Sequence, residues 1–388
     1  MKSDNNLICL TLLVLTSCNF FNQTLLAQPS QQLSIQKKDL AQQQDSNMLF
    51  PILSKGKTTS EGNWNQDRGY IDRTGKIVIK PQFNLADPFK DGMAVVSLEG
   101  KDGYIDKTGT LIIPPQFDGA EPFFEGMAAV QINDKWGYIN QQGEIVIKPQ
   151  FDEVQAFSQG LAAVKIGENW GYIDKIGKIV IPLHFENADS FSEGLAVARI
   201  RCSDAITKID CNDNIGELDD SRYGFIDSSG KLAIKTTFFY ASRFSEGLAA
   251  VNTFGASGYI DASGKMVIKP QFNKANVFSE GLAAVEVNEG WGYINKTGQM
   301  VIKPMFYEAW LFSEGLAVVG VVDNKNNKLS YGYIDSRGTI VIQPKFDEPS
   351  SFRGGLAEVK IIKSKDDDTY SDWGYIDKTG KFVWNLFE

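Results

Sequence analysis

The sequence has little of the chemistry on which most enzymes depend, because its 388 residues include a single histidine, His184. One histidine leaves almost no room for a Ser–His–Asp triad or for a zinc site built on several imidazoles. The P-loop, the Rossmann fingerprint, HExxH and CxxC are absent as well. We interpret His184 as a solvated loop residue. We therefore expect a protein that is not an enzyme and that needs no cofactor or metal ion.

The sequence also has fewer basic than acidic residues. The chain has 39 Lys and Arg against 48 Asp and Glu, which gives a net charge of -9 and a pI near 5.0. A nucleic-acid binder normally carries a basic footprint, so we expect no nucleic-acid partner. A glycosidase-type pair of carboxylates stays open as an alternative, although the acids that recur along the chain are explained by turns.

Long apolar runs are missing, and the run of 9 residues at 7–15 is too short to span a bilayer. It is typical of a signal peptide, which we place at residues 1–27. Residues 15–18 resemble a bacterial lipobox, in which Cys18 would become the lipidated first residue. The alternative is plain secretion after cleavage near Ala27. Residues 28–48 are Gln-rich and predict a disordered tether. We expect an exported protein of the periplasm or cell surface, either lipid-anchored or secreted, and contact with the membrane only through such an anchor.

Cysteine is scarce, and two of the four lie in the signal region. The other two, Cys202 and Cys211, are nine positions apart in a chain that we expect to be exported. An oxidising compartment favours a disulfide between them. The neighbouring residues 210–216 have the D-x-N-x-N opening of a calcium loop, but the glycine comes one residue late and Ser221 stands where a bidentate Glu should be. We therefore favour an ordinary turn there.

What the chain has in abundance is a repeat of Gly-aromatic-Ile-Asp/Asn, a glycine three residues later, and a run of Val and Ile. A fixed period of this size indicates a tandem array of small structural units. Most copies are 34 residues apart, and the extra residues fall at 200–222, 320–330 and 361–372. The leading glycines are Gly69, Gly103, Gly137, Gly171, Gly224, Gly258, Gly292, Gly332 and Gly374.

Each repeat predicts strands rather than helices. Counting from the leading glycine as position 0, short aromatic and β-branched segments surround an Asp-Lys-Thr-Gly turn, which predicts a tight hairpin. A third strand follows the glycine at +23. Phenylalanine at +14 and +20 predicts a plug between neighbouring units. Since in-line units need an even number of chain reversals, we also expect a short fourth strand or a crossover. The class is all-β.

The pattern Trp-Gly-Tyr-Ile-Asp-Lys-Thr-Gly, continued by Pro-x-Phe-Asp-x-Ala-x-x-Phe-Ser-Glu-Gly, resembles the WG-repeat family, also called KWG repeats. The resemblance covers residues 69–384 and implies a bacterial β-repeat protein with no catalytic residues to carry over. The signature Trp is present in four copies and replaced by Arg68, Asp102, Tyr223, Ser257 or Tyr331 in the others. The candidates for stacking on a ligand are Trp136, Trp170, Trp291 and Trp373.

For residues 49–388 we predict an open, curved, β-solenoid-like array of about nine 34-residue repeats. The alternative is a closed, propeller-like ring, in which the lone strand near residue 50 and the two strands after Trp373 would meet at the seam. We expect a monomeric interaction scaffold of the bacterial envelope with a protein or glycan partner. The alternatives are a carbohydrate-active hydrolase and a purely structural spacer.

Overall fold

The computed structural model describes residues 47–55, 57–58, 64–65, 67–201, 221–253, 255–323, 325, 327–365 and 368–386. Over these ranges the chain forms strands and turns, and none of it is a helix with the length and apolarity needed to cross a bilayer. The predicted signal peptide with Cys18, the tether, and both Cys202 and Cys211 lie outside the described residues. Residues 49–388 make up one structural unit.

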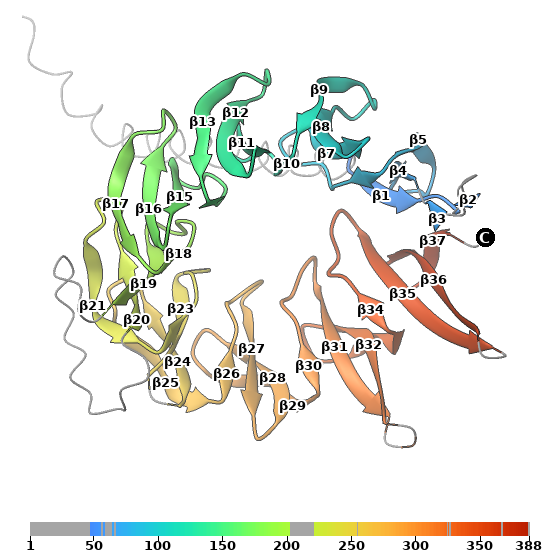
Figure 1. Ribbon diagram of the computed structural model, residues 1–388. Helices are drawn as coiled ribbons and strands as arrows, with labels where there is room; N and C mark the ends of the chain where they lie inside the picture. Colours follow the sequence, from blue (N-terminus) through green and yellow to red (C-terminus); the bar gives the residue numbers. More distant parts are fainter. Residues whose placement is uncertain are drawn as a thin grey trace, which may run out of the picture. The chain divides into compact units, whose positions relative to one another are not determined.

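This unit is built from nine antiparallel sheets that follow one another along the described chain (Figure 1). Eight sheets have four strands and the first has three. In each sheet the strands run in sequence order from the centre of the ring to its periphery. Each sheet is therefore a blade, and the unit is a nine-bladed β-propeller.

The strands fall into four classes by their place in a blade. The innermost have two residues each: β6 (Leu85–Ala86), β10 (Gly119–Ala120), β14 (Glu153–Val154), β18 (Asn187–Ala188), β22 (Tyr240–Ala241), β26 (Lys274–Ala275), β30 (Glu308–Ala309) and β34 (Glu348–Pro349). The second strands are β1 (Leu49–Leu53), β7 (Ala94–Leu98), β11 (Met127–Ile132), β15 (Leu161–Ile166), β19 (Ala196–Arg201), β23 (Leu248–Asn252), β27 (Leu282–Val287), β31 (Leu316–Asp323) and β35 (Leu356–Lys365).

The third strands are β4 (Arg68–Asp72), β8 (Lys101–Ile105), β12 (Lys135–Asn140), β16 (Asn169–Asp174), β20 (Ser221–Ile226), β24 (Ser257–Asp261), β28 (Gly290–Asn295), β32 (Lys328–Asp335) and β36 (Asp368–Asp377). The outermost are β5 (Ile77–Phe83), β9 (Leu111–Phe117), β13 (Ile145–Phe151), β17 (Ile179–Phe185), β21 (Leu232–Phe238), β25 (Met266–Phe272), β29 (Met300–Phe306), β33 (Ile340–Phe346) and β37 (Phe382–Asn385). A small separate ladder joins β2 (Lys57–Thr58) and β3 (Trp64–Asn65).

A blade is not a sequence repeat but the end of one repeat joined to the start of the next. The inner two strands of a blade come from the latter part of one repeat, and the outer two are the Trp-Gly hairpin of the following repeat. Accordingly β1 completes the first sheet by pairing with β4, and β36 and β37 complete the last sheet beside β35. The short fourth strand that restores the chain direction is present as the two-residue inner strand.

The outer hairpin of each blade is fixed by its turn residues, as the sequence predicts. In the first blade one carboxylate oxygen of Asp72 accepts hydrogen bonds from the backbone N–H groups of Thr74 and Lys76 and from the Thr74 hydroxyl. Gly75 closes the turn with a φ of 85°, a conformation that glycine adopts without strain. The recurrent Asp is therefore a turn former.

The hydrophobic core lies between successive blades, and the repeated phenylalanines fill it. Phe151 is 2% exposed and shares a cluster with Tyr138 of its own blade and with Phe157 and Val164 of the next. All sixteen phenylalanines at +14 and +20 are buried. The small alanine at +25, as in Ala162, is buried in the same layer. The predicted plug between neighbouring units is confirmed.

Polar groups also join each blade to its neighbour. The carboxylate of Glu125 accepts hydrogen bonds from the backbone N–H groups of Gln159 and Gly160 in the next blade, at 2.7 and 3.0 Å. The ammonium of Lys175 lies 3.3 Å from the same carboxylate. Glu125 itself has a φ of 52°, an uncommon left-handed conformation for a residue with a side chain. Glu280 and Glu314 make the corresponding bonds further along the ring.

The first and last blades meet, so the prediction of an open solenoid is wrong and the alternative of a closed ring is correct. The hydroxyl of Tyr375 in the last blade donates to the carbonyl of Pro51 in the first, at 2.8 Å. The guanidinium of Arg353, in the last blade, donates a hydrogen bond to the carbonyl oxygen of Phe89 at 3.4 Å. We expected an open array because 34 residues are few for a four-stranded blade. The inner strand needs only two residues, so four strands fit.

Two of the three insertions are extensions of regular strands. Strands β31 and β32 have eight residues each and β35 and β36 have ten, whereas β27 and β28 have six (Figure 1). The insertion at 200–222 also begins and ends on paired strands, since Arg201 pairs with Ser221. All three connect the second and third strands of a blade. Because equivalent connections of a ring lie on one face, the bases of all three insertions lie on the same face of the propeller, and the hairpins β31–β32 and β35–β36 project from it.

Candidate binding site on the inner surface

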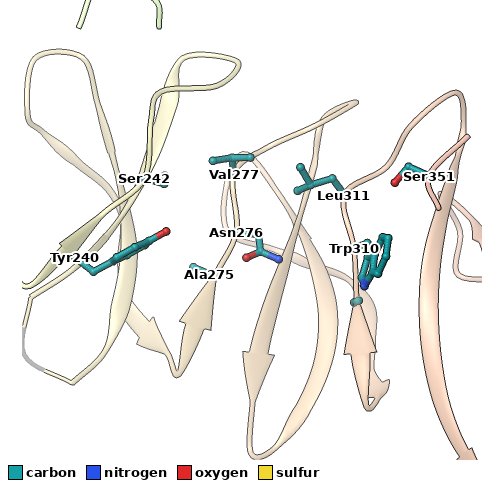
Figure 2. Close-up of a pocket in the computed structure, with 9 residues that line it drawn as sticks. Tyr240, Ser242, Ala275, Asn276, Val277, Trp310, Leu311 and Ser351 are labelled. Atoms are coloured by element: carbon teal, nitrogen blue, oxygen red, sulfur yellow. The ribbon is translucent and has the colours of Figure 1, made fainter. Parts of the chain in front are cut away.

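An open hollow lies on the inner surface of the ring, over four consecutive blades (Figure 2). Its volume is about 390 Å³, within the range of roughly 300–1,000 Å³ that small-molecule sites occupy. The residues that line it come from positions +16 to +19 of successive repeats, at or just after the innermost strands. They are Tyr240, Ser242, Ala275, Asn276, Val277, Ala309, Trp310, Leu311 and Ser351.

Two aromatic side chains lie in this hollow, two blades apart. Tyr240 is 51% exposed and comes from β22, whereas Trp310 directly follows β30, two blades further on. Figure 2 shows the side chain of Asn276 between them. The ring of Trp310 contacts Tyr331 with 6.4 Å between centroids, and Tyr240 contacts Tyr223 at 6.0 Å. Trp310 and Tyr240 are thus each packed against a second aromatic ring.

The polar groups of the hollow are neutral. The carboxamide of Asn276, the hydroxyl of Tyr240 and the indole N–H of Trp310 make no hydrogen bond to any described residue. Burial, with the charge of Asp189 and then Tyr223 behind it, raises the pKa of Tyr240, so its hydroxyl stays protonated. These groups can therefore donate to a ligand, and the amide oxygen can accept from one.

The backbone beneath these side chains is held from the neighbouring blades. The buried hydroxyl of Tyr259 donates to the carbonyl of Asn276 at 2.7 Å, and that of Tyr293 donates to the carbonyl of Trp310 at 2.8 Å. The floor between them is made of Ala275 and Ala309, which are 8% and 6% exposed. The hollow is therefore formed in advance of any ligand.

The part of the inner surface that the earlier blades form is acidic, and it extends to the blade next to that of Tyr240. Position +18, which carries Asn276 and Trp310 in the later repeats, carries Asp87, Glu121 and Asp189 in the earlier ones. Burial, together with the charge of Asp102, raises the pKa of Asp87. Partial desolvation and the charges of Asp87 and Asp102 raise the pKa of Glu121 as well. The inner wall thus has an acidic part and a neutral, aromatic part.

Asp102 stands where other repeats have the signature Trp. One of its oxygens accepts a hydrogen bond from the backbone N–H of Ala120 at 3.0 Å, and the other accepts from the Ser97 hydroxyl. Among the described residues no group of three or more His, Cys, Asp or Glu is arranged to hold a metal ion. Residues 210–216, for which we predicted an ordinary turn rather than a calcium loop, lie outside those residues.

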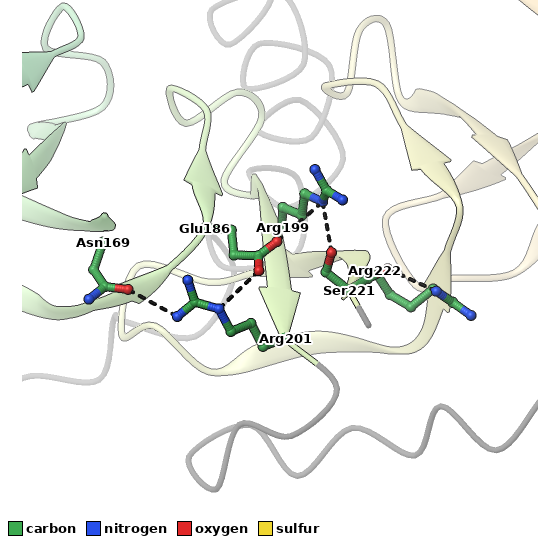
Figure 3. A network of polar contacts seen from close by, with 6 residues as sticks. All are labelled: Asn169, Glu186, Arg199, Arg201, Ser221 and Arg222. Carbon is green, nitrogen blue, oxygen red and sulfur yellow. Dashed lines mark hydrogen bonds and ion pairs between the residues drawn. The ribbon is translucent and has the colours of Figure 1, made fainter. Parts of the chain in front are cut away.

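A network of charged groups lies at the base of the longest insertion (Figure 3). The carboxylate of Glu186 is bound by two guanidinium groups, from Arg201 at 2.9 Å and Arg199 at 3.4 Å. Arg199 also donates to the Ser221 hydroxyl at 3.0 Å. Arg222 is 4% exposed and lies over the ring of Phe239. This network fixes the ends of the insertion on β19 and β20.

The four tryptophans predicted to stack on a ligand lie within the blades. Trp170 is 7% exposed and part of a core cluster, and Trp136 and Trp291 are partly buried against other clusters. The indole N–H of Trp373 donates to Glu358 at 2.5 Å. None of the four lines the hollow. Ligand stacking by them stays a prediction.

The residues of the hollow were not among the sequence predictions, although two signals point to them. Trp310 is the only tryptophan at +18, where most repeats have a polar residue. Tyr223 and Tyr331, which contact the two aromatic side chains of the hollow, are two of the residues that replace the signature Trp. The lone histidine has no part in it, and its interpretation as a solvated loop residue is wrong, because His184 lies in strand β17 and is partly buried. Its ring contacts Phe185, and its Nδ1 lies 2.8 Å from the carbonyl oxygen of Pro182.

The architecture and the repeated motif define the class of this protein, a β-propeller made of tandem repeats. The sequence profile of the WG-containing repeat matches residues 69–101, 103–136, 136–170, 170–201, 223–253, 258–291, 291–325 and 331–361. The chain therefore belongs to the WG-repeat family. No curated protein matches the sequence.

Among solved structures, the chain resembles a eukaryotic initiation factor with a TM-score of 0.59 at 8% identity, over 86% of this chain and 95% of that one. At this identity the similarity shows the fold alone. The extracellular domain of a hybrid two-component system from B. thetaiotaomicron matches with a TM-score of 0.26 at 10% identity, over 82% of this chain and 57% of that one.

Proposed function

We propose that this protein is a non-enzymatic, exported binding scaffold of the bacterial cell envelope, and that the inner-surface hollow is its ligand site. The hollow carries the proposal, because it combines two supported aromatic side chains with unengaged neutral polar groups. Such a mixture of apolar lining and a few placed polar groups is typical of binding sites. The apolar run at residues 7–15 supports export.

The face that carries the insertions supplies a second surface for a larger partner. The strands of the hairpins β31–β32 and β35–β36 have eight and ten residues, whereas the equivalent strands of the other blades have five or six. Loops on a rigid scaffold are where binding residues commonly lie. We propose that a partner held at the envelope contacts these hairpins while the hollow holds its ligand.

Affinity capture from envelope extracts tests the proposal. The immobilised protein is compared with two variants, Tyr240→Ala and a chain whose β31–β32 and β35–β36 hairpins are cut to the length of β27–β28. We expect an envelope component, protein or glycan, to be retained by the parent and lost from at least one variant. Retention of the same components by all three proteins, or by none, would contradict the scaffold function.

A carbohydrate-active hydrolase is the second candidate, and one observation favours it. Asp87 and Glu121 have raised pKa values and lie near Asp102, and a carboxyl group with a raised pKa is suited to act as a general acid. Incubation of the protein with a labelled glycan library tests this candidate. Turnover that Asp87→Asn or Glu121→Gln abolishes would establish the hydrolase; binding without turnover favours the scaffold.

A further inference from the structure

We propose that the inner-surface hollow binds a neutral saccharide chain, with the side chains of Tyr240 and Trp310 contacting sugar rings and Asn276 bonding their hydroxyls. This inference rests on the proposed binding function and names its ligand class. It follows from three features of the hollow: the chemistry of its lining, the absence of charge from it, and its construction.

The lining matches the two surfaces of a pyranose ring. The axial C–H groups of a sugar form an apolar face, which packs on an aromatic ring, while its equatorial hydroxyls form a polar edge. Tyr240 and Trp310 supply aromatic rings two blades apart, with Ala275 and Ala309 forming an apolar floor. The carboxamide of Asn276 lies between them and can donate to one hydroxyl and accept from the next.

Charge selects against other small ligands. None of the side chains that line the hollow is ionised at neutral pH. The nearest carboxylate on β30, that of Glu308, accepts the hydroxyl hydrogen of Tyr331 at 2.9 Å. At the Tyr240 end the charge of Asp189 acts on the hydroxyl of Tyr240. Arg243, which follows Ser242 in the chain, acts on the same Asp189 with a charge of opposite sign. A phosphate or carboxylate ligand would find no cation among the residues that line the hollow, and a cationic ligand would favour the acidic part.

The construction of the hollow favours weakly held, extended chains over a single deeply buried molecule. It is open toward the centre of the ring, and its contacts come from equivalent positions of successive blades. The backbone carbonyls of Asn276 and Trp310 are fixed by buried tyrosines of the preceding blades, so little ordering is needed on binding. Repeated units along a polysaccharide can occupy repeated positions along such a wall.

Isothermal titration of the full mature protein with defined oligosaccharides tests the proposal. The neutral probes are tetrasaccharides of cellulose, starch, laminarin and chitin; the charged probes are tetrasaccharides of polygalacturonate and chitosan. The variants are Tyr240→Ala and Asn276→Ala. Tyr307→Ala is the matched control, because Tyr307 is 59% exposed, comparable to Tyr240 at 51%, and does not line the hollow. Circular dichroism confirms that all variants fold.

We expect at least one neutral probe to bind, with an affinity that falls about tenfold or more in Tyr240→Ala and in Asn276→Ala and stays within about twofold of the parent in Tyr307→Ala. Three outcomes would overturn the inference: no binding of any neutral probe at millimolar concentration, preferential binding of a charged probe, or neutral binding that neither hollow variant weakens. If the hollow instead retains a protein from the envelope extract, the saccharide inference fails while the proposed scaffold function stands.

Discussion

The hydroxyl of Tyr375 donates a hydrogen bond to the carbonyl oxygen of Pro51 at 2.8 Å, across 324 positions of sequence. At seven of the eight other joints the equivalent tyrosine bonds a carbonyl only 17 positions later, as from Tyr70 to Asp87, and at the eighth Phe225 takes its place. Pro51 occupies the place of Val95, whose carbonyl accepts the N–H of Asp87 within its own blade. The first blade has no inner strand among its described residues, which leaves the Pro51 carbonyl to the last blade.

Phe50 completes the same joint. Elsewhere a phenylalanine at +20 packs on the tyrosine of the preceding blade, with centroids 4.8 Å apart for Tyr104 and Phe123 and 5.0 Å apart for Tyr172 and Phe191. Phe50 stands instead at the position of the recurrent alanine, and its ring lies 5.4 Å from that of Tyr375. Phenylalanine in place of alanine at position 50 therefore fills the space that the phenylalanine at +20 fills at the other joints.

The first prediction concerns this joint. Phe50 is 5% exposed, so Phe50→Ala should lower the free energy of unfolding by about 3–5 kcal/mol, as for other buried phenylalanines. Urea unfolding followed by circular dichroism measures the effect. The exposed Tyr307→Ala serves as the control and should have little effect. An unchanged unfolding midpoint for Phe50→Ala would mean that Phe50 does not hold the ends together.

The second prediction concerns an ordinary joint in the middle of the ring. Phe151→Ala should cost about 3–5 kcal/mol, because the side chain is 2% exposed between two blades. Thr297→Ala removes only an exposed hydroxyl that donates to Asn295 and should cost far less. Thermal unfolding of the two variants provides the comparison. Equal losses would show that the phenylalanine layer is not the core.

The third prediction concerns pH. The pKa of Asp87 is raised in the fold, chiefly by burial and then by the charge of Asp102. An Asp in the unfolded chain ionises near pH 4, so at higher pH the charge of Asp87 opposes folding. Asp87→Asn should therefore stabilise the protein at neutral pH, with the gain vanishing below about pH 4. The pKa of Asp106 is lowered, first by its hydrogen bond from the Thr108 hydroxyl, so its charge favours folding.

Asp106→Asn is the matched substitution of opposite sign. Asn already serves in the same turn at Asn140, so the backbone bonds can be kept. The variant should be less stable than the parent at neutral pH, and this loss should shrink as the pH falls through the lowered pKa of Asp106. The midpoints of urea unfolding of both variants and the parent, measured at pH 3.5 and pH 7.5, give the sign of each change in stability. Shifts of the same sign for Asp87→Asn and Asp106→Asn at neutral pH would refute the electrostatic account.

The fourth prediction concerns Cys202 and Cys211, which lie outside the described residues. The insertion that holds them starts after Arg201 and ends before Ser221, and these two residues pair across β19 and β20. The ends of the loop are therefore fixed close together, and a crosslink within it would contribute about 2–3 kcal/mol by chain entropy. Mass spectrometry of the protein produced in an oxidising compartment and kept without reductant should find the two peptides linked. Free, alkylatable thiols at both positions would exclude the disulfide.

Much of the fold could be predicted from the sequence because the repeat averages over nine copies. Local chemistry predicts the Asp-x-x-Gly turn, the strands on either side of it and the buried phenylalanines, and the same residue pattern recurs in each copy. Ring closure did not follow, since it depends on the two-residue length of strands such as β22 and on one unrepeated residue, Phe50. A periodic pattern cannot show that one residue, Phe50, replaces the recurrent alanine where the last blade meets the first.

The binding site was harder to predict for the same reason. Repetition directs attention to what the copies share, such as the signature Trp, whereas the hollow is made of departures from the pattern. Trp310 and Tyr240 stand where other repeats have different residues, and the packing of successive blades brings them into one surface. In a repeat protein of this kind, function is expected where the copies differ.

The closed ring is the central claim, because the inner surface and the common face of the insertions both depend on it. Nitroxide labels at Thr74→Cys and Thr379→Cys, in a chain whose native cysteines are replaced by serine, report the distance across the seam by double electron–electron resonance. Both residues are exposed in the outer turns of the first and last blades. The pair Thr74→Cys and Thr108→Cys reports an ordinary joint. The ring predicts matching distance distributions for the two pairs; a seam distance far longer than that of the ordinary joint would contradict closure.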